Sequence, residues 1–375
     1  MPTSRRAFLG AASVFLGGCA VRRTTVTSAA APRTARLALA PVRVSPDRVI
    51  RTIAGLRPYR APGFVVRSEK IGDRLVVHNY GHGGAGITLS WGTSYLAVQE
   101  AQRAGEMREC AVIGCGVVGL STARLLQERG FRPTIYAREM PPAVTSNVAG
   151  GLWEPVSIFA QDRVTPEFRR QFAEAGRYAF RRYQSLAGER YGVRWLPLYR
   201  LAEAAPQTPA PESPNSDIEP LYPEKRALTA AENPFAVPFV DRRYSMLIEP
   251  AIYLAELIRD FEIAGGRIVV REFHGREDVA ALSEGTVFNC TGLGARTLFG
   301  DAELTPVKGQ LAFLLPQPEV NYMTIGPQGT YMFPRHDGIL LGGSFETGVE
   351  NTTVEEATIA RILRDNAAVF NAMRG

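Results

Sequence analysis

Cysteine and histidine are scarce in this chain of 375 residues, which contains four of each. Cys110 and Cys115 flank one predicted strand and Cys290 ends another, and three such thiols do not make a disulfide framework. We therefore expect these cysteines to be small buried apolar residues. No spacing of cysteine or histidine typical of a metal site occurs, so the sequence predicts no bound metal ion.

A concentrated block of positive charge is absent as well. The formal net charge is +6, but the many arginines are scattered among acidic residues. This pattern is typical of a solvated surface and argues against a nucleic-acid partner. With 45% apolar residues, a chain of this length can bury a large core, in one large domain or in two closely joined domains.

The first residues have the features of an export signal. Residues 7–18 are apolar but too few to span a bilayer as a stable anchor, and Arg5-Arg6 before them resembles a twin-arginine signal. Leu16-Gly17-Gly18-Cys19 resembles a lipobox, in which a lipid is attached to the cysteine. We therefore predict a twin-arginine lipoprotein signal over residues 1–19 and a periplasmic protein that contacts the membrane only through a lipid on Cys19. An ordinary signal peptide with an incidental cysteine is the alternative. Residues 20–40 lack periodicity and are predicted to be a tether.

A glycine-rich turn predicts a dinucleotide site. Residues 111–113 predict a short buried strand, residues 120–129 predict a helix, and Gly114-Cys115-Gly116-Val117-Val118-Gly119 lies between them. Gly114 permits a tight turn, Gly116 lets the backbone approach a pyrophosphate, and Gly119 lets the helix pack on the strand. The helix N-terminus favours the negative charge of the pyrophosphate. Because residues 134–137 predict a second strand, the pattern indicates a Rossmann-type unit.

Two neighbouring residues are candidates for binding the ribose. Glu139 lies 20 positions after Gly119, the spacing expected of a ribose-binding acid. For Arg138 the alternatives are contact with an adenosine phosphate and a plain surface position. Both are included among the predicted cofactor-binding residues.

Several motifs together resemble the D-amino-acid oxidase family of FAD-dependent enzymes. Residues 116–123 resemble the family's first helix, and residues 141–155 (PPAVTSNVAGGLWEP) resemble the loop that holds the flavin diphosphate and ring. Residues 78–92 (HNYGHGGAGITLSWG) resemble the segment that contacts the isoalloxazine ring, and residues 289–292 resemble the strand end that contacts the nucleotide. Together the fingerprint and the resemblance imply an FAD site with the following residues: Gly83, Gly84, Ala85, Gly86, Ile87, Thr88, Gly114, Gly116, Val117, Val118, Gly119, Arg138, Glu139, Thr145, Ser146, Gly150, Gly151, Leu152, Phe273 and Thr291.

The order of these segments is inverted relative to the family, in which the fingerprint lies near the N-terminus and the counterpart of residues 78–92 near the C-terminus. We therefore expect a circular permutation, with residues 41–104 as the transposed C-terminal part of the family. The expected fold is α/β, a Rossmann-type FAD-binding domain joined to a mixed-sheet substrate domain. The predicted FAD-binding domain comprises residues 41–155 and 281–302, and the predicted substrate domain comprises residues 156–280 and 303–375.

The resemblance also implies the chemistry. Arg57, in Gly55-Leu56-Arg57-Pro58, matches the arginine that forks onto the substrate α-carboxylate, and Tyr331 matches a tyrosine whose hydroxyl reaches the same group. Gly84 and Glu154 are further predicted substrate-binding residues. The implied reaction is oxidative deamination of D-amino acids by hydride transfer to flavin N5, with oxygen as the second substrate and a 2-oxo acid, ammonia and hydrogen peroxide as products. No acid–base side chain is required, and we expect His78 and His82 to hold the glycine-rich loop.

Other functions stay open at this point. A second active-site tyrosine of the family is missing, because its place falls near Pro327. The chemical alternatives are an oxidase acting on D-aspartate, glycine or a secondary amine, or a dehydrogenase using another electron acceptor. From another class, the alternative is a non-catalytic flavin-binding lipoprotein. A nicotinamide dehydrogenase is a weaker option because it leaves residues 78–92 without a role. The sequence carries no signal for an oligomeric state.

Overall fold

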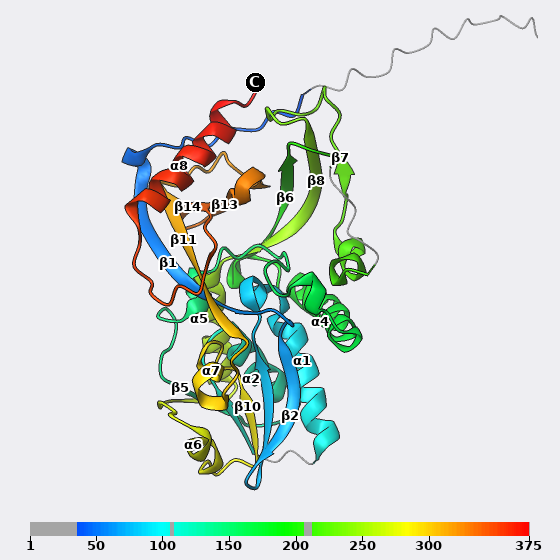
Figure 1. The fold of residues 1–375 in the computed structure, drawn as a ribbon, viewed down its shortest axis with the longest axis vertical. Coiled ribbons are helices and arrows are strands. Elements are labelled where there is room, and N and C mark those ends of the chain that lie inside the picture. The colour runs from blue at the N-terminus through cyan, green and yellow to red at the C-terminus, as the bar shows by residue number, and fades with distance from the viewer. Residues whose placement is uncertain (1–35, 106–108, 206–211, 375) are drawn as a thin grey trace, which may run out of the picture. The chain divides into compact units, whose positions relative to one another are not determined.

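The structure is a computed structural model and describes residues 36–105, 109–205 and 212–374 (Figure 1). The predicted export signal over residues 1–19, its Cys19, and residues 20–35 of the predicted tether lie outside the described residues. The described chain builds two β-sheets, one of six strands and one of nine.

The six-stranded sheet is of the Rossmann type. Its order is β2 (Val65–Ile71), β3 (Arg74–Tyr80), β10 (Thr286–Asn289), β4 (Cys110–Ile113), β5 (Thr134–Ala137) and β9 (Arg267–Val270). Strand β2 runs antiparallel to β3, and all other neighbours are parallel. Because the inner strands of a parallel sheet are covered on both faces, every residue of β4 and of β10 is buried.

Helices cover both faces of this sheet. Val112 packs in the core beneath α1 (Gly86–Ala104) and α2 (Val117–Glu128), whereas Ala111 and Ile113 point to the opposite face, towards α6 (Arg276–Ala280) and α7 (Gly294–Phe299). This alternation follows from the two-residue period of a strand. Outside this layer, α4 (Pro166–Ser185) packs on α1, and α5 (Pro250–Ile263) packs on α2. Among the described residues, no helix is both long enough and apolar enough to cross a membrane.

The nine-stranded sheet is mixed. Its order is β1 (Val49–Arg60), β11 (Leu304–Leu314), β14 (Gly338–Gly342), β13 (Tyr331–Arg335), β12 (Met323–Ile325), β6 (Val193–Ala202), β8 (Phe239–Ile248) and β7 (Arg226–Ala227), while β15 (Glu346–Thr347) pairs with β11. Only β12 and β6 are parallel neighbours. Helix α8 (Glu356–Asn371), drawn in red in Figure 1, packs on β11 and β14. The opposite face carries Tyr331, Phe333 and Leu311.

Short helices complete the connections. They are η1 (Pro46–Arg48), η2 (Gly83–Ala85), α3 (Thr145–Val148), η3 (Gln161–Arg163), η4 (Glu189–Tyr191), η5 (Pro214–Asp217), η6 (Glu219–Leu221) and η7 (Pro327–Gly329). Two of them, η2 and α3, lie in the glycine-rich segments that the sequence singles out.

The α/β fold with a Rossmann-type unit is confirmed, but the predicted domain boundaries differ from the sheets. Strand β1 was assigned to the FAD-binding domain and instead pairs with β11 of the larger sheet over its whole length. Conversely, α5 and β9 were assigned to the substrate domain, yet α5 packs on α2 and β9 pairs with β5. The reason is that the chain crosses between the sheets several times, and the sheet a short strand joins depends on long-range pairing.

Residues 36–40 are part of the fold, so the predicted tether is wrong for them. The Leu37 backbone N–H donates to the Glu232 carbonyl oxygen at 3.0 Å, and the Tyr322 hydroxyl donates to the Ala40 carbonyl oxygen at 2.8 Å. Leu37 and Leu39 pack against the core under α8. The prediction failed because the alanine- and proline-rich composition of residues 20–40 as a whole gave no sign that these two leucines pack on the core.

Candidate active site

One large cavity lies between two parts of the structure. One is the face of the nine-stranded sheet that carries Tyr331, Phe333 and Leu311, and the other is the carboxyl edge of the parallel strands. The cavity volume is about 1430 Å³, above the roughly 300–1000 Å³ that suffices for drug-sized ligands. Both glycine-rich segments line it, since Gly83 and Gly86 belong to one and Gly114 and Gly116 to the other. Segments that are separated in sequence therefore face the same space, as the sequence analysis predicts.

Buried polar contacts hold the two segments together. The Asn79 side-chain amide donates to Ser94 Oγ and Thr122 Oγ1, both at 3.3 Å, and these two hydroxyls lie 2.8 Å apart. All three side chains are fully buried. Because Ser94 lies on α1 and Thr122 on α2, the contacts fix the two helices side by side with both N-termini at the cavity.

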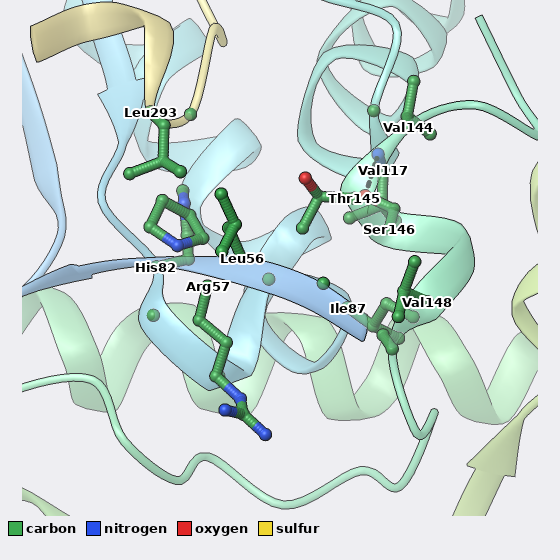
Figure 2. Close-up of a pocket in the computed structure, with 18 of the residues that line it drawn as sticks. Leu56, Arg57, His82, Ile87, Val117, Val144, Thr145, Ser146, Val148 and Leu293 are labelled. Atoms are coloured by element: carbon green, nitrogen blue, oxygen red, sulfur yellow. Dashed lines mark hydrogen bonds between the residues drawn. The ribbon is translucent and has the colours of Figure 1, made fainter. Parts of the chain in front are cut away.

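The start of α2 is built to receive an anion. Its N-cap, Gly116, supplies no side-chain cap, and a Cβ placed there would meet only Ser146 Oγ, at 3.2 Å. The Val117 N–H donates to that hydroxyl at 3.0 Å, the pair drawn with a dashed line in Figure 2. The next amides of the first turn have no partner within the helix, so they are available to a diphosphate at the open side of Gly116.

Two predicted cofactor residues do not line the cavity. A Cβ on Gly119 would lie 1.9 Å from the Gly114 carbonyl oxygen, so Gly119 serves the close packing of α2 on the β4 turn. Ala85 is fully buried and packs in the main core. Gly119 thus has the packing role that the fingerprint assigns to it without lining the cavity, and the prediction that Ala85 contacts the cofactor is contradicted by its place in the core. The others do line it: Gly83, Gly84, Gly86, Ile87, Thr88, Gly114, Gly116, Val117, Val118, Arg138, Glu139, Thr145, Ser146, Gly150, Gly151, Leu152, Phe273 and Thr291.

The end of the cavity beside β5 and β9 is polar and partly exposed. Arg138 forms ion pairs with Glu139 at 3.5 Å and with Glu272 at 3.3 Å. Arg271, whose guanidinium carbon lies 4.6 Å from the Phe273 ring centroid, also lines this end. Glu272 and Arg271 were missed in the sequence. They follow β9, and only the pairing of β9 with β5 brings them to the carboxyl edge beside Arg138.

Two histidines support the glycine-rich segment. His78 is fully buried, accepts from the Asn289 amide at 2.9 Å through Nδ1, and donates to Glu69 at 2.9 Å through Nε2. Asn289 in turn accepts from the Thr291 hydroxyl at 2.7 Å, so the bonds reach the cavity wall. His82 contacts Thr93 Oγ1 at 2.8 Å, and complete burial lowers its pKa to about 3. Both histidines therefore hold the loop, as expected.

Arg57 projects from β1 into the other end of the cavity. In Figure 2 its side chain extends away from Thr145, Ser146 and Val117. A Cβ on Gly309, which lies on the neighbouring strand, would be 2.4 Å from Arg57 Nη2, so only glycine leaves room for the guanidinium. Its Nη1 donates to the Ser344 carbonyl oxygen at 3.3 Å. Within the described part of the chain, Arg57 has no carboxylate at ion-pair distance.

Tyr331 lies against two glycines close to Arg57. A Cβ on Gly342 or Gly343 would lie 2.0 or 2.4 Å from the Tyr331 ring. Burial raises the pKa of the Tyr331 phenol, and the neighbouring Arg57 guanidinium opposes this shift. The hydroxyl therefore stays protonated at neutral pH and can donate a hydrogen bond to an anion held by Arg57.

An ionic cluster around the buried Lys308 supports the loop that Arg57 contacts. The Lys308 ammonium is buried and donates to Glu355 at 2.7 Å. Ser344 accepts from the Gln310 backbone N–H at 2.9 Å and donates to Glu346 at 2.6 Å. These bonds fix the Ser344 carbonyl, and through it the Arg57 guanidinium.

The remaining charges near Arg57 are compensated. Arg200 pairs with Glu154 at 2.9 Å, and Arg361 pairs with Asp365 at 3.4 Å. Near the position of the missing tyrosine, Gln328 lines the cavity from η7. Arg57 is thus the described cation at this end that has no acidic partner, which suits it to a ligand carboxylate.

The cavity fits FAD on its own geometry. Two helix N-termini open into it, and neither α1 nor α2 has an acidic residue in its first turn. Gly86, like Gly116, has an open side, since a Cβ there would come no closer than 3.9 Å to its neighbours. Asn79 Oδ1, on the cavity wall, is buried without a partner in the described residues. The fold and site define a dinucleotide-binding α/β protein whose cavity has a second end, lined by Arg57 and Tyr331.

Comparison with known proteins places the chain in a family. The model described as "DAO: FAD dependent oxidoreductase" matches residues 109–374, so the chain belongs to this family of FAD-dependent oxidoreductases and FAD is its cofactor. The D-amino-acid oxidase of Rubrobacter xylanophilus is 32% identical over 270 residues, which cover 70% of this chain and 78% of that protein. The D-amino-acid oxidase of Streptomyces coelicolor is 32% identical over 277 residues, covering 71% and 79%.

Solved structures share the fold. The glycine oxidase of Geobacillus kaustophilus superposes with a TM-score of 0.53 at 19% identity, over 71% of this chain and 79% of that one. At that identity the likeness supports the architecture alone. It agrees with the two sheets described above.

Proposed function

We propose that this protein is a D-amino-acid oxidase, which converts a D-amino acid and oxygen to a 2-oxo acid, ammonia and hydrogen peroxide. The observation that carries this proposal is Arg57, a cation with no acidic partner in the described part of the chain, which lies beside the Tyr331 hydroxyl in the same cavity as the cofactor-binding segments. The relatives named D-amino-acid oxidase support the choice of substrate class.

Arg57 and Tyr331 bind the substrate carboxylate. A guanidinium presents parallel N–H donors that match both oxygens of a carboxylate, and the Tyr331 hydroxyl adds a third donor. The Arg57 guanidinium lies against Gly309 and the Tyr331 ring against Gly342, so both donors are seated on the backbone of the sheet and present the carboxylate with a defined set of N–H and O–H groups. Fixing the carboxylate orients the rest of the amino acid relative to the cofactor.

The first turns of α1 and α2, with Ser146 and Thr291, would hold the cofactor. When bound, FAD accepts two electrons from the amino acid, giving an imino acid that water hydrolyses, and passes them to oxygen. His82 does not take up the substrate's proton, because burial lowers its pKa to about 3 and its bond to Thr93 holds it in place. We propose that the substrate amine loses its proton to solvent before oxidation.

The test is a panel of D-amino acids with their L-enantiomers as matched controls. Purified protein is mixed with each compound without oxygen, the flavin absorbance is followed, and peroxide is then measured in air. We expect bleaching and peroxide with uncharged D-amino acids and neither with the L-forms. Bleaching without peroxide would favour a dehydrogenase. A flavin that stays oxidised with the whole panel would favour the non-catalytic flavin-binding lipoprotein.

We propose as well that the chain is a circular permutation of the family's order. The family match covers residues 109–374, while residues 78–92 supply the second side of the cavity. The Tyr322 hydroxyl touches both the Ala40 carbonyl oxygen, at 2.8 Å, and Met373 Sδ, at 3.8 Å, so the parts preceding β1 and following α8 are neighbours. A chain that begins at residue 109, with residues 36–105 joined after residue 374, should bind FAD and keep its activity. Loss of folding in that rearranged chain would argue against the permutation.

From the sequence alone, we propose that the protein is periplasmic and is anchored to the membrane by a lipid on Cys19. Arg5-Arg6 and the lipobox ending at Cys19 indicate twin-arginine export and a lipid anchor. Replacing both arginines by lysine should retain the protein in the cytoplasm, and Cys19→Ala should release it from the membrane fraction. Unchanged fractionation of both variants would refute the proposal.

A further inference from the structure

A second guanidinium lies on the same face of the nine-stranded sheet as Tyr331. Arg200 on β6 is the register partner of Ile325 on β12, and Ile325 is the partner of Tyr331 on β13. Register partners point to the same side of a sheet, and all three residues line the cavity. Since the backbones of neighbouring strands are about 4.8 Å apart, the backbone of Arg200 lies about 10 Å from that of Tyr331, two strands across the sheet. From a carboxylate bound at Tyr331, Ile325 and then Arg200 are the next cavity-lining residues across this face of the sheet.

Arg200 does not stand alone at that position. Its Nη1 donates to Glu154 Oε1 at 2.9 Å, and the Tyr222 hydroxyl donates to Glu154 Oε2 at 2.9 Å. The Glu154 side chain is only 11% exposed, whereas the Arg200 side chain is 33% exposed. Glu154 is also anchored through its backbone, because its carbonyl oxygen accepts from the Thr88 hydroxyl at 3.2 Å. The acid is thus held in place, and its negative charge is cancelled by Arg200.

The support behind Glu154 is itself rigid. Tyr222 is buried, and the guanidinium carbon of buried Arg243 lies 4.6 Å from its ring centroid. Burial and the neighbouring Glu154 carboxylate raise the pKa of Tyr222 well above its ordinary value, so its hydroxyl remains a donor. The ion pair therefore has little freedom to rearrange around a charged ligand.

We propose that the Glu154–Arg200 ion pair sets the charge selectivity of the substrate side-chain compartment. Resting on the proposed function, this inference assigns the pair the role of admitting uncharged side chains and rejecting both acidic and basic ones. An acidic side chain meets the fixed Glu154 carboxylate, and a basic side chain meets Arg200. To be accommodated, an acidic side chain would have to pair with Arg200 and leave the buried Glu154 carboxylate uncompensated, and a basic one would have to pair with Glu154 and leave Arg200 uncompensated.

Opposite single substitutions should shift the selectivity in opposite directions. Glu154→Gln keeps the shape of the side chain and leaves Arg200 unpaired, so acidic D-amino acids should gain about tenfold or more in kcat/KM relative to neutral ones. Arg200→Gln leaves Glu154 unpaired, so basic D-amino acids should gain by a similar factor. The double variant should return to a preference for neutral side chains. Arg242→Gln is the matched control, because Arg242 is an ion-paired residue of β8 that does not line the cavity.

A binding measurement separates this inference from the proposed activity. Butyrate, succinate and 4-aminobutyrate are similar in length and differ in charge at one end, and perturbation of the flavin absorbance reports their Kd without turnover. The wild type should bind butyrate most tightly, Glu154→Gln should gain about tenfold for succinate, and Arg200→Gln should gain about tenfold for 4-aminobutyrate.

Each outcome decides between the two claims. If the wild type prefers a charged ligand, or if folded, flavin-containing single variants keep the wild-type ratios, the charge-selectivity inference is overturned. If the three ligands behave as expected but no D-amino acid bleaches the flavin, the compartment is as inferred and the oxidase proposal fails. The wild-type comparison alone is sufficient to refute the inference should a variant not fold.

Discussion

Arg57 and Arg200 line the same cavity from the same sheet, yet only Arg200 is paired with a carboxylate in the described residues. Arg57 lies over Gly309, contacts backbone carbonyl oxygens and has no acidic partner in the described residues. Arg200 is bonded to Glu154, which Tyr222 holds from the other side. An unpaired cation in a partly buried site is unfavourable unless a ligand supplies the negative charge. The contrast indicates where the substrate carboxylate binds and where its side chain lies.

Removing the unpaired guanidinium should have the largest effect. In Arg57→Ala the substrate carboxylate loses its charged partner, so we expect kcat/KM to fall by about two to three decades, corresponding to roughly 3–4 kcal/mol. Steady-state kinetics with a neutral D-amino acid measures the loss, and the flavin content should not change. A loss below about fivefold would mean that the carboxylate binds elsewhere.

Displacing Arg57 without removing it should come next. In Gly309→Ala the new Cβ would lie 2.4 Å from Arg57 Nη2, and the guanidinium, at the end of a flexible side chain, would have to move. We expect kcat/KM to fall about tenfold or more with a nearly unchanged Tm. Gly285→Ala is the matched control because a Cβ there meets no atom within 4 Å. Equal kinetics for the two variants would contradict the tight seating of Arg57.

Removing the neutral donor should matter less than removing the charge. Tyr331→Phe keeps the ring against Gly342 and Gly343 and deletes one hydrogen bond to the carboxylate, worth about 1–1.5 kcal/mol. We therefore predict a loss of about five- to tenfold in kcat/KM, mainly through KM. A loss as large as that of Arg57→Ala would assign the tyrosine a part in the chemistry itself.

Substitution of His82, in the glycine-rich loop, should change the stability of the protein and the pH dependence of that stability. Burial lowers the pKa of His82 to about 3 from an ordinary value of 6.5. Below pH 6.5 the unfolded chain takes up a proton that the folded chain does not, so the free energy of unfolding falls by up to about 1.4 kcal/mol per pH unit as the pH drops towards 3. His82→Asn should therefore lose less stability than the wild type between pH 6.5 and 4 in denaturant titrations. Parallel pH profiles would show that His82 is not buried as a neutral group.

Local patterns were sufficient to predict the cofactor side of the molecule. The strand, glycine turn, helix and second strand around Gly114–Gly119 depend on neighbouring residues only, and the structure has them as β4, α2 and β5. Arg57 was found because a short motif surrounds it. Gly119 has the packing role that the fingerprint predicts, whereas Ala85 was misplaced because membership of a motif does not say which way a residue faces, and Ala85 points into the core.

Long-range pairing explains what the sequence could not show. Arg200 reaches the cavity through its register with Ile325, and Glu272 reaches Arg138 through the pairing of β9 with β5. Glu154, which carries a negative charge, was predicted as a substrate-binding residue. Its partner Arg200 cancels that charge, a contact between residues 46 positions apart that no local pattern reveals.

The oxidase account is tested most directly by mixing the flavin-containing protein with the D- and L-forms of one uncharged amino acid in the absence of oxygen. The account predicts that the D-form bleaches the flavin absorbance of the wild type within one turnover, that Arg57→Ala bleaches at least a hundredfold more slowly, and that the L-form leaves both unchanged. Bleaching by both enantiomers at equal rates, or at the same rate in wild type and Arg57→Ala, would contradict it.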